Sequence, residues 1–557
     1  MTALFSKITA FFTAIVLFLT SIPVLFYPKV PPAESVSELM NCRLTEKKEL
    51  GDDIYVVKTG GHTSDEVLAL TCLQGIVAKT NPCIYIVSNR AYESYLSELE
   101  KSGKNIIRTD ENGKDWNLYS LIGRFSSYIE DNGCVIWQSS EYAYSLNVAV
   151  NFAALNSWLP VTKEIREKLG DKALTVKVDL TAEEEGPDLQ KKYYEQMKGS
   201  FKSGAVVHVK YSKNGVRDLA IEQGWYCFYT DGTSEGKRFL KSVLKDFGEN
   251  TRVLGWVEEE KSVVTLISKQ GCSLNPLDYA LNTSYLSQAD VPVASQENEG
   301  TVHTDDSKHY VCLLFSDGDN MQWIINGYSE YFDKVGNYNG IVMNWTFSPM
   351  MSELCPFMHN NVYNTAGSTN YFVCGPSGIA YNNPSKYKKT ALDGLSKDTA
   401  AAMLRSGQRV LTILDDYSAL KEADMLYSFK YFSRFDNIDG ALLYLDPGRY
   451  EAGRGRVWFS DDKPFISTRL SLWHPDGYDG VTDEWLREQA EIINNYPADI
   501  HSINGYSLIC IHAWSMKNGS IEKFLSYLDD DVVVLSAPDF INTVSANIPH
   551  KKAVPDS

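Results

Sequence analysis

The chain has 557 residues, of which 44% are hydrophobic and 22% are charged. This length suggests about two to four domains, and the composition excludes low-complexity disorder. The formal net charge of −18 argues against a nucleic-acid partner, because phosphate backbones are bound by clustered Lys and Arg.

The amino terminus carries an apolar run. After Lys7, residues 8–27 are interrupted only by Thr, Ser21 and Pro23. A basic flank followed by such a run is typical of a secretory signal, and its length approaches that of a membrane anchor. We therefore interpret residues 1–27 as a signal peptide or a retained anchor and expect a secreted or surface-anchored protein. A buried core helix is the third alternative.

A Pro-rich polar stretch, residues 28–44, is expected to be a linker, and residues 45–300 alternate strand-like and helical runs. Strands are predicted at 53–61 and 83–87 and helices at 62–80 and 91–101. This alternation indicates an α/β region with a parallel sheet, with a subdomain break near 180–200. Gly60-Gly61 lacks the third glycine of a dinucleotide fingerprint, so no nucleotide cofactor is predicted.

Residues 305–548 are the most regular part of the chain and follow a polar stretch at 294–308. Helical segments separate several of the eight strand-like runs. This pattern predicts a β/α barrel like that of triosephosphate isomerase, with a seven-stranded variant left open. The runs lie at 309–315, 341–346, 370–374, 409–414, 440–445, 465–471, 507–512 and 532–536.

Acidic residues follow two of these predicted strands. Asp317 and Asp319 come after the first strand, and Asp415 and Asp416 end the fourth. Because catalytic groups of such barrels project from the carboxyl ends of strands, these four are the candidate catalytic residues. Glycoside hydrolysis needs a carboxylic acid to protonate the leaving oxygen and a carboxylate as base or nucleophile. Turn formation and helix capping are the competing explanations.

Other polar and aromatic residues near the strand ends are candidates for binding sugars. Core packing is the alternative for the aromatic members. The candidate substrate-binding residues are Asn320, Trp345, Tyr381, Tyr444, Asp446, Trp473, His512 and Trp514. Glycoside hydrolysis by two carboxyl groups predicts no cofactor. In a second interpretation of the same residues, Asp317, Asp319 and His512 would hold a divalent metal ion that activates water.

The segment Gly375-Pro-Ser-Gly-Ile-Ala-Tyr-Asn-Asn-Pro384 carries a family resemblance. Its Gly378, Tyr381 and Pro384 resemble the signature of the GxGYxYP family of glycoside hydrolases, whereas Ala380 and Asn383 replace a glycine and a tyrosine. Other matching stretches are Ser316 to Asn320, Gly255-Trp256 through Glu258, Ser273, Asp278 and Asn282-Thr283-Ser284.

The resemblance spans about residues 50–545. It implies an amino-terminal α/β region, a motif-bearing carboxyl-terminal domain and a carbohydrate substrate, and it brings no catalytic pair with it. Ala takes positive φ less readily than Gly, so a different loop backbone is expected at Ala380. The loop that contains Gly378 and Ala380 is expected either to form part of the entrance to a substrate-binding pocket or to be a structural turn.

Three hypotheses follow. The first is a secreted hydrolase of poly- or oligosaccharides that uses Asp317 with Asp415 or Asp416. The second is a metal-dependent polysaccharide deacetylase-like hydrolase, and the third is a glycan-binding surface protein without catalysis.

Overall fold

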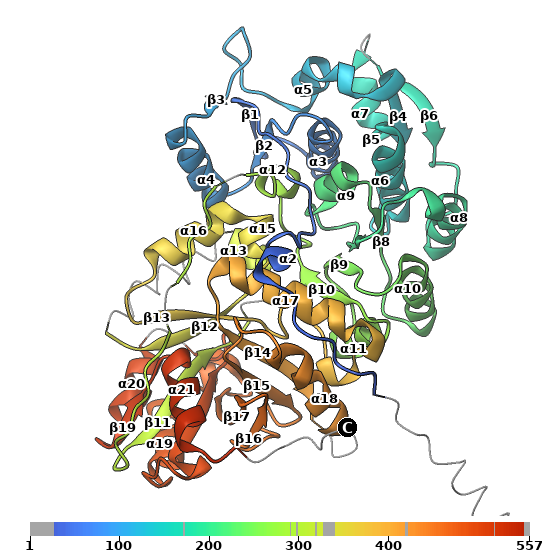
Figure 1. Cartoon of the computed structure of the whole chain (residues 1–557). Coiled ribbons are helices and arrows are strands. Elements are labelled where there is room, and N and C mark those ends of the chain that lie inside the picture. The colour runs from blue at the N-terminus through green and yellow to red at the C-terminus, as the bar shows by residue number, and fades with distance from the viewer. Residues whose placement is uncertain are drawn as a thin grey trace, which may run out of the picture. The chain divides into compact units, whose positions relative to one another are not determined.

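The computed structural model describes residues 27–170, 173–289, 291–296, 299–317, 320–326, 340–417, 422–516 and 519–550. Within these residues, three small parallel sheets precede a barrel (Figure 1). Asp319 and residues 1–26, which include almost all of the amino-terminal apolar run, lie outside the described residues. Among the described helices, none is long and apolar enough to cross a membrane.

The first two sheets have three strands each, in the orders β2-β1-β3 and β5-β4-β6. The middle of β1 is buried on both faces, as expected for a parallel sheet covered by helices. The first sheet contains β1 (Asp53–Lys58), β2 (Ile84–Val87) and β3 (Asn105–Ile107), with α3 (Ser64–Ala78), α4 (Arg90–Lys101) and α5 (Leu118–Arg124). The second contains β4 (Gly133–Ile136), β5 (Leu159–Val161) and β6 (Thr175–Asp179), with α6 (Tyr144–Asn156), α7 (Lys163–Lys168) and α8 (Pro187–Met197).

The third sheet has four strands in the order β10-β9-β7-β8, all parallel. Its strands are short and fully buried, and helices separate them along the chain. They are β7 (Ala205–His208), β8 (Tyr226–Phe228), β9 (Arg252–Gly255) and β10 (Ser273–Pro276), with α9 (Arg217–Gln223), α10 (Ser234–Phe247), α11 (Glu260–Lys269) and α12 (Thr283–Leu286). The prediction of an amino-terminal parallel α/β region is confirmed.

A parallel barrel of seven strands with interleaved helices forms the carboxyl-terminal part, which confirms the seven-stranded form of the prediction. Its ring is β11 (His309–Phe315), β12 (Met343–Phe347), β13 (Asn370–Cys374), β14 (Val410–Asp416), β15 (Gly440–Asp446), β17 (Lys463–Leu472) and β18 (Tyr506–Ile511). The helices are α13 (Met321–Ile325), α15 (Met351–Leu354), α16 (Pro356–Thr365), α17 (Leu392–Ser406), α18 (Glu422–Ser433), α19 (Asp483–Asn494), α20 (Ser520–Ser526) and α21 (Ala537–Asn547).

The eighth predicted run forms a strand outside the ring. This strand, β19 (Val532–Val534), pairs only with the first three residues of β11, whereas β12 pairs with Leu314 and Phe315 at the end of β11. The other edge of β11 is paired along six residues with β18. Because β12 and β19 share the remaining edge of β11, the ring closes with seven strands. A short β16 (Val457–Ser460) pairs antiparallel with β17.

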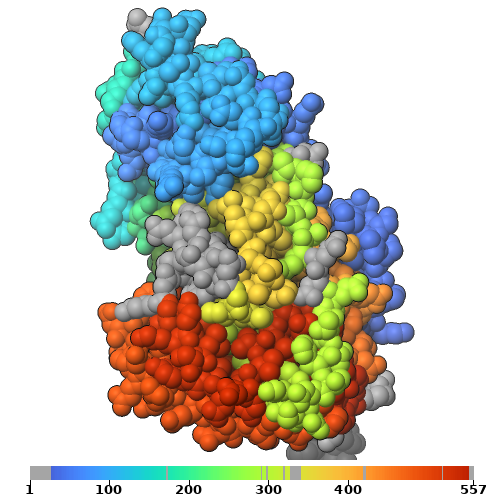
Figure 2. All heavy atoms as spheres, turned by 90° about the vertical axis from the view of Figure 1, so that its left-hand side faces the viewer, coloured from blue at the N-terminus to red at the C-terminus, as the bar shows by residue number. Residues whose placement is uncertain are grey.

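The stretch predicted as a linker packs on the barrel from Pro32 onward. It contains the short helix α2 (Val36–Met40), which contacts α17, and Leu39 of this helix is buried. Glu34 pairs with Arg434 of the barrel. In the space-filling view of Figure 2, the yellow segment that contains α16 lies between the blue amino-terminal layer and the red barrel, and α16 contacts α4.

Candidate functional site

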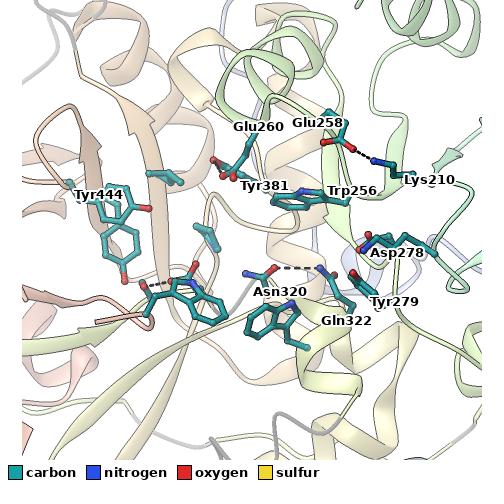
Figure 3. Close-up of a pocket in the computed structure, with 18 of the residues that line it drawn as sticks. Lys210, Trp256, Glu258, Glu260, Asp278, Tyr279, Asn320, Gln322, Tyr381 and Tyr444 are labelled. Carbon is teal, nitrogen blue, oxygen red and sulfur yellow. Dashed lines mark hydrogen bonds and ion pairs between the residues drawn. The ribbon is translucent and has the colours of Figure 1, made fainter. Parts of the chain in front are cut away.

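A pocket of about 530 Å³ lies where the carboxyl ends of the barrel strands face those of the third sheet (Figure 3). In open α/β sheets and in β/α barrels alike, this end of the strands is where ligands bind. The third sheet contributes residues that follow β7, β9 and β10. The barrel contributes Tyr444, near the end of β15, and residues that follow β11, β13 and β18. They include Lys210, Trp256, Glu258, Glu260, Asp278 and Tyr279 from the sheet and Asp317, Asn320, Gln322, Tyr381, Tyr444 and Trp514 from the barrel.

The loop after β13 joins the two halves of the pocket. Tyr381 forms a two-way backbone bridge with Leu274 of β10, at 2.8 and 3.0 Å. Asn275 donates its side-chain N–H to the carbonyl of Ile379 at 3.1 Å. The tyrosine hydroxyl then donates to Glu260 Oε1 at 3.0 Å. The signature segment of the sequence is therefore the connection through which the barrel holds a glutamate of the third sheet.

Gly378 of this loop cannot be replaced without strain, both because a side chain has no room there and because its backbone is left-handed. Gly378 has φ +86°, and a Cβ there would overlap the hydroxyl of Thr399, so a larger residue would be strained. Ala380, by contrast, does not adopt a left-handed conformation. An alanine fits this position without strain, although the family signature has glycine there.

Asp317 lies two residues after the end of β11 and lines the pocket. Its φ of 67° is a left-handed conformation that Asp tolerates better than most residues, and it turns the chain sharply after the strand. The Ser316 hydroxyl and the Trp514 side chain hydrogen-bond to the Asp317 carboxylate. Burial raises the pKa of Asp317, and these two hydrogen bonds act in the opposite direction.

Glu260 faces the same pocket from the first position of α11. It remains in contact with solvent, yet the surrounding protein raises its pKa. Partial burial is the largest cause; the hydrogen bond from Tyr381 lowers the pKa, and the negative charge of Asp317 raises it further. The two carboxyl groups, which come from different sheets, are therefore electrostatically coupled across the pocket.

Two further carboxylates line the sheet side of the pocket. Glu258 accepts hydrogen bonds from Tyr229 at 2.9 Å and Lys210 at 3.2 Å, which outweigh the effect of burial and lower its pKa. Asp278 is 5% exposed, and burial raises its pKa to about 6 against the opposing charge of Lys213. The ionised form of Glu258 is thus stabilised, whereas burial favours the protonated form of Asp278.

Two buried polar atoms in residues of the pocket wall have no hydrogen-bond partner among the described residues. They are Asp278 Oδ1 and Gln322 Oε1. Buried polar groups in folded proteins are almost always hydrogen-bonded, because leaving one unpaired costs about 1–3 kcal/mol. Figure 3 shows Tyr444 on one side of the pocket and Asp278 on the other. Both unpaired atoms are shielded from solvent, and they mark the part of the pocket wall where a polar ligand would supply hydrogen-bond partners.

The structure brings together five of the twelve residues that the sequence singled out. Asp317, Asn320, Tyr381, Tyr444 and Trp514 all line the pocket. They derive from three strand ends and from the loop after β13, as expected for residues that project from the carboxyl ends of barrel strands.

The other acidic candidates are engaged elsewhere. Asp415 is 1% exposed and accepts hydrogen bonds from the Ser385 N–H and hydroxyl, both at 2.7 Å. Asp416 pairs with Lys386 and Asp446 with Lys261. None of these three aspartates lines the pocket, and their partners account for acidic side chains at these positions. Asp319 lies outside the described residues.

Trp345, Trp473 and His512 also lie away from the pocket lining. Trp345 is buried in the barrel wall, where its indole N–H donates to Asn370 at 2.9 Å. The Trp473 and His512 rings stack with their centroids 3.8 Å apart and their planes at 4°. Burial lowers the pKa of His512 to about 4, which keeps this imidazole neutral at physiological pH.

Sequence reasoning from the barrel strands missed the residues of the third sheet, among them Glu260, Asp278 and Tyr279. The signal that points to them is the family resemblance, whose matching stretches include Gly255-Trp256 through Glu258 and Asp278. Glu260 lies just after the first of these stretches.

Metal binding finds no support in the part of the chain that the structure describes. No group of three or more His, Cys, Asp or Glu side chains there could hold a metal ion. Because Asp319 is not described, the interpretation of Asp317, Asp319 and His512 as metal ligands stays a prediction.

Comparisons with known proteins agree with the fold and the signature loop. Three family models match: the "GxGYxYP putative glycoside hydrolase C-terminal domain" at 307–545, the "GxGYxYP third domain" at 205–288 and the "GxGYxYP_N second domain" at 132–196. No curated protein matches the chain. A crystal structure described as a putative hydrolase from Bacteroides thetaiotaomicron is 24% identical, with a TM-score of 0.78 over 91% of this chain and 99% of that one. At that identity the likeness concerns the fold. Together the family matches span more than half of the sequence, and the chain belongs to the GxGYxYP family of putative glycoside hydrolases.

Proposed function

We propose that this protein hydrolyses glycosidic bonds of a poly- or oligosaccharide with Asp317 and Glu260 as its two catalytic carboxyl groups. The observation that carries the proposal is their convergence on one pocket, in which the negative charge of Asp317 raises the pKa of Glu260. Glu260 replaces Asp415 and Asp416 as the partner of Asp317, because neither of those two lines the pocket.

The surroundings of the two groups suggest their roles. Asp317 accepts two side-chain hydrogen bonds, which stabilise its ionised form. Glu260 has one such donor, Tyr381, and lies in the field of the Asp317 charge, which favours its protonated form. Glu260 is therefore assigned as the general acid and Asp317 as the nucleophile or general base.

In the reaction, Glu260 gives its proton to the glycosidic oxygen as the bond from that oxygen to the anomeric carbon breaks. Asp317 either attacks the anomeric carbon directly or takes a proton from the water that does so. Other residues of the pocket have binding roles in this scheme. Asp278 and Gln322 would hydrogen-bond to sugar hydroxyls, and the half-buried indole of Trp256 would contact an apolar sugar face.

Aryl glycosides with different leaving groups test the assignment. A leaving group such as 2,4-dinitrophenolate departs without protonation, whereas an alkyl or sugar alcohol needs the acid. We expect Glu260→Gln to lose at least about a hundredfold in kcat on unactivated substrates and to retain most of its activity on the dinitrophenyl glycoside. Asp317→Asn should lose activity on both.

Asp416→Asn is the matched control, because Asp416 is also an acidic residue at the end of a barrel strand but lies outside the pocket and pairs with Lys386. It should keep normal kinetics. Full activity of Asp317→Asn would refute the assignment. Metal-dependent release of acetate, or glycan binding without release of new reducing ends, would instead support the deacetylase or the non-catalytic hypothesis.

The apolar run at residues 8–27 supports the further proposal that the enzyme acts outside the cytoplasm, secreted or anchored to the surface. Amino-terminal sequencing of the protein from the culture medium and from the membrane fraction distinguishes a cleaved signal from a retained anchor. Recovery of the full-length chain only in the cytoplasm would contradict export.

A further inference from the structure

Exposed aromatic side chains gather around the pocket. Within the described residues, the most exposed large aromatics are Tyr142 at 59%, Tyr279 at 49%, Trp323 at 37%, Tyr478 at 36% and Trp514 at 36%. Tyr279, Trp323 and Trp514 line the pocket, and Tyr478 is close enough to Asp317 for the charge of that aspartate to raise the pKa of Tyr478. A cluster of exposed aromatic side chains at a pocket is typical of a ligand-binding surface.

Three of these residues lie at neighbouring strand ends of the barrel and are here called the aromatic rim: Trp323, Tyr478 and Trp514. They follow β11, β17 and β18, which are neighbours in the ring. The Trp323 and Trp514 rings meet edge to face, with centroids 4.2 Å apart.

The rim is held in place from behind. The Tyr478 hydroxyl donates to the carbonyl of Ala513 at 2.7 Å, so the turn after β17 is fixed to the residue that precedes Trp514. Trp514 in turn hydrogen-bonds to Asp317. The rim therefore begins at the proposed catalytic carboxylate and leads away from it over neighbouring strand ends.

We propose that the aromatic rim is a second sugar subsite, so that the substrate is a neutral oligosaccharide of at least two residues that extends from the pocket over the rim. This inference rests on the proposed hydrolase function. Sugar rings have apolar C–H faces, and rigid aromatic side chains bind such faces with little loss of conformational entropy.

The charge around the rim favours a neutral sugar. The turn that carries Tyr478 also carries the exposed Asp476, and the rim starts at the carboxyl group of Asp317. A uronic acid or a sulfated sugar placed over this turn would be repelled by these like charges. The two pocket lysines, Lys210 and Lys213, belong to the third sheet rather than to the rim.

The test measures how affinity grows with substrate length. Isothermal titration in the Asp317→Asn background would use mono- to tetrasaccharides of β-1,4-glucan, β-1,4-mannan and α-1,4-glucan, with oligogalacturonides as the acidic series. We expect one neutral series to gain at least roughly tenfold in affinity from monosaccharide to tetrasaccharide. Trp323→Ala and Tyr478→Ala should reduce that gain to about twofold, whereas Trp323→Phe should keep most of it.

Tyr142→Ala is the matched control, because Tyr142 is exposed but does not line the pocket; it should leave the length dependence unchanged. An unchanged gain in both rim variants would overturn the second subsite and leave the hydrolase proposal intact. Tighter binding of the acidic series would overturn the neutral substrate. Failure to bind or hydrolyse any saccharide of any length would overturn both proposals.

Discussion

Replacing Tyr381 with Phe isolates one hydrogen bond to the proposed acid. The backbone bridge to β10 remains, and only the hydroxyl that donates to Glu260 is lost. A hydrogen bond to a charged group is worth about 1.5–3 kcal/mol when shielded from water. Glu260 is in contact with solvent, so water partly replaces the hydroxyl, and we expect about 0.7 kcal/mol. That energy corresponds to about half a pKa unit.

The sign follows from which form the hydroxyl stabilises. Tyr381 lowers the pKa of Glu260, so its loss raises that pKa. Because a general acid works in its protonated form, the alkaline limb of the kcat/KM profile should move to higher pH by about half a unit. The assay is kcat/KM on an unactivated glycoside across the pH range.

Tyr229→Phe is the control, because the Tyr229 hydroxyl donates to Glu258 instead. It should leave the alkaline limb in place. Movement of the limb to lower pH in Tyr381→Phe, or an equal shift in both variants, would refute the assignment of Glu260 as the acid.

Three other predictions concern stability and accessibility. Burial raises the pKa of Asp415 to about 6, above its ordinary value in the unfolded chain. The stability that this group contributes is therefore full below about pH 4 and is lost as pH rises to about 6, by up to about 3 kcal/mol. Urea unfolding should show a weaker pH dependence in Asp415→Asn. Gly378→Ala should lower both the Tm and kcat, because a Cβ overlaps Thr399 at a positive φ, whereas Gly199→Ala, where a Cβ meets open space, should do neither. All ten cysteines are free and all but Cys42 are buried, so a thiol reagent should titrate about one thiol in the native protein and ten in urea; rapid reaction of several native thiols would contradict the burial.

The strands of the barrel could be predicted because parallel strands that are buried on both faces have continuous apolar sequences. All eight runs form strands. The closure of the ring could not be predicted, because Val532–Val534 reads like the other runs. Its exclusion depends on how β12 and β19 divide one edge of β11, which is a long-range property.

Half of the proposed catalytic pair could also be predicted. Asp317 follows a strand whose carboxyl end faces the pocket, and this logic holds for any barrel. Asp415 follows an equally apolar strand, but Ser385 binds its carboxylate, and no local signal distinguishes the two. Glu260 comes from a helix of another sheet, and its proximity to Asp317 arises only in the tertiary structure.

The bridge between Tyr381 and Leu274 has a consequence for how the protein would unfold on heating. Tyr381 is also packed into the hydrophobic core of the third sheet, and Asn275, Ser268 and Arg252 bond to barrel residues around the bridge. The sheet and the barrel therefore cannot separate without exposing that core, so turnover and helical circular dichroism should be lost together on heating. Thermal inactivation would then report the unfolding of both parts rather than a local opening at their junction.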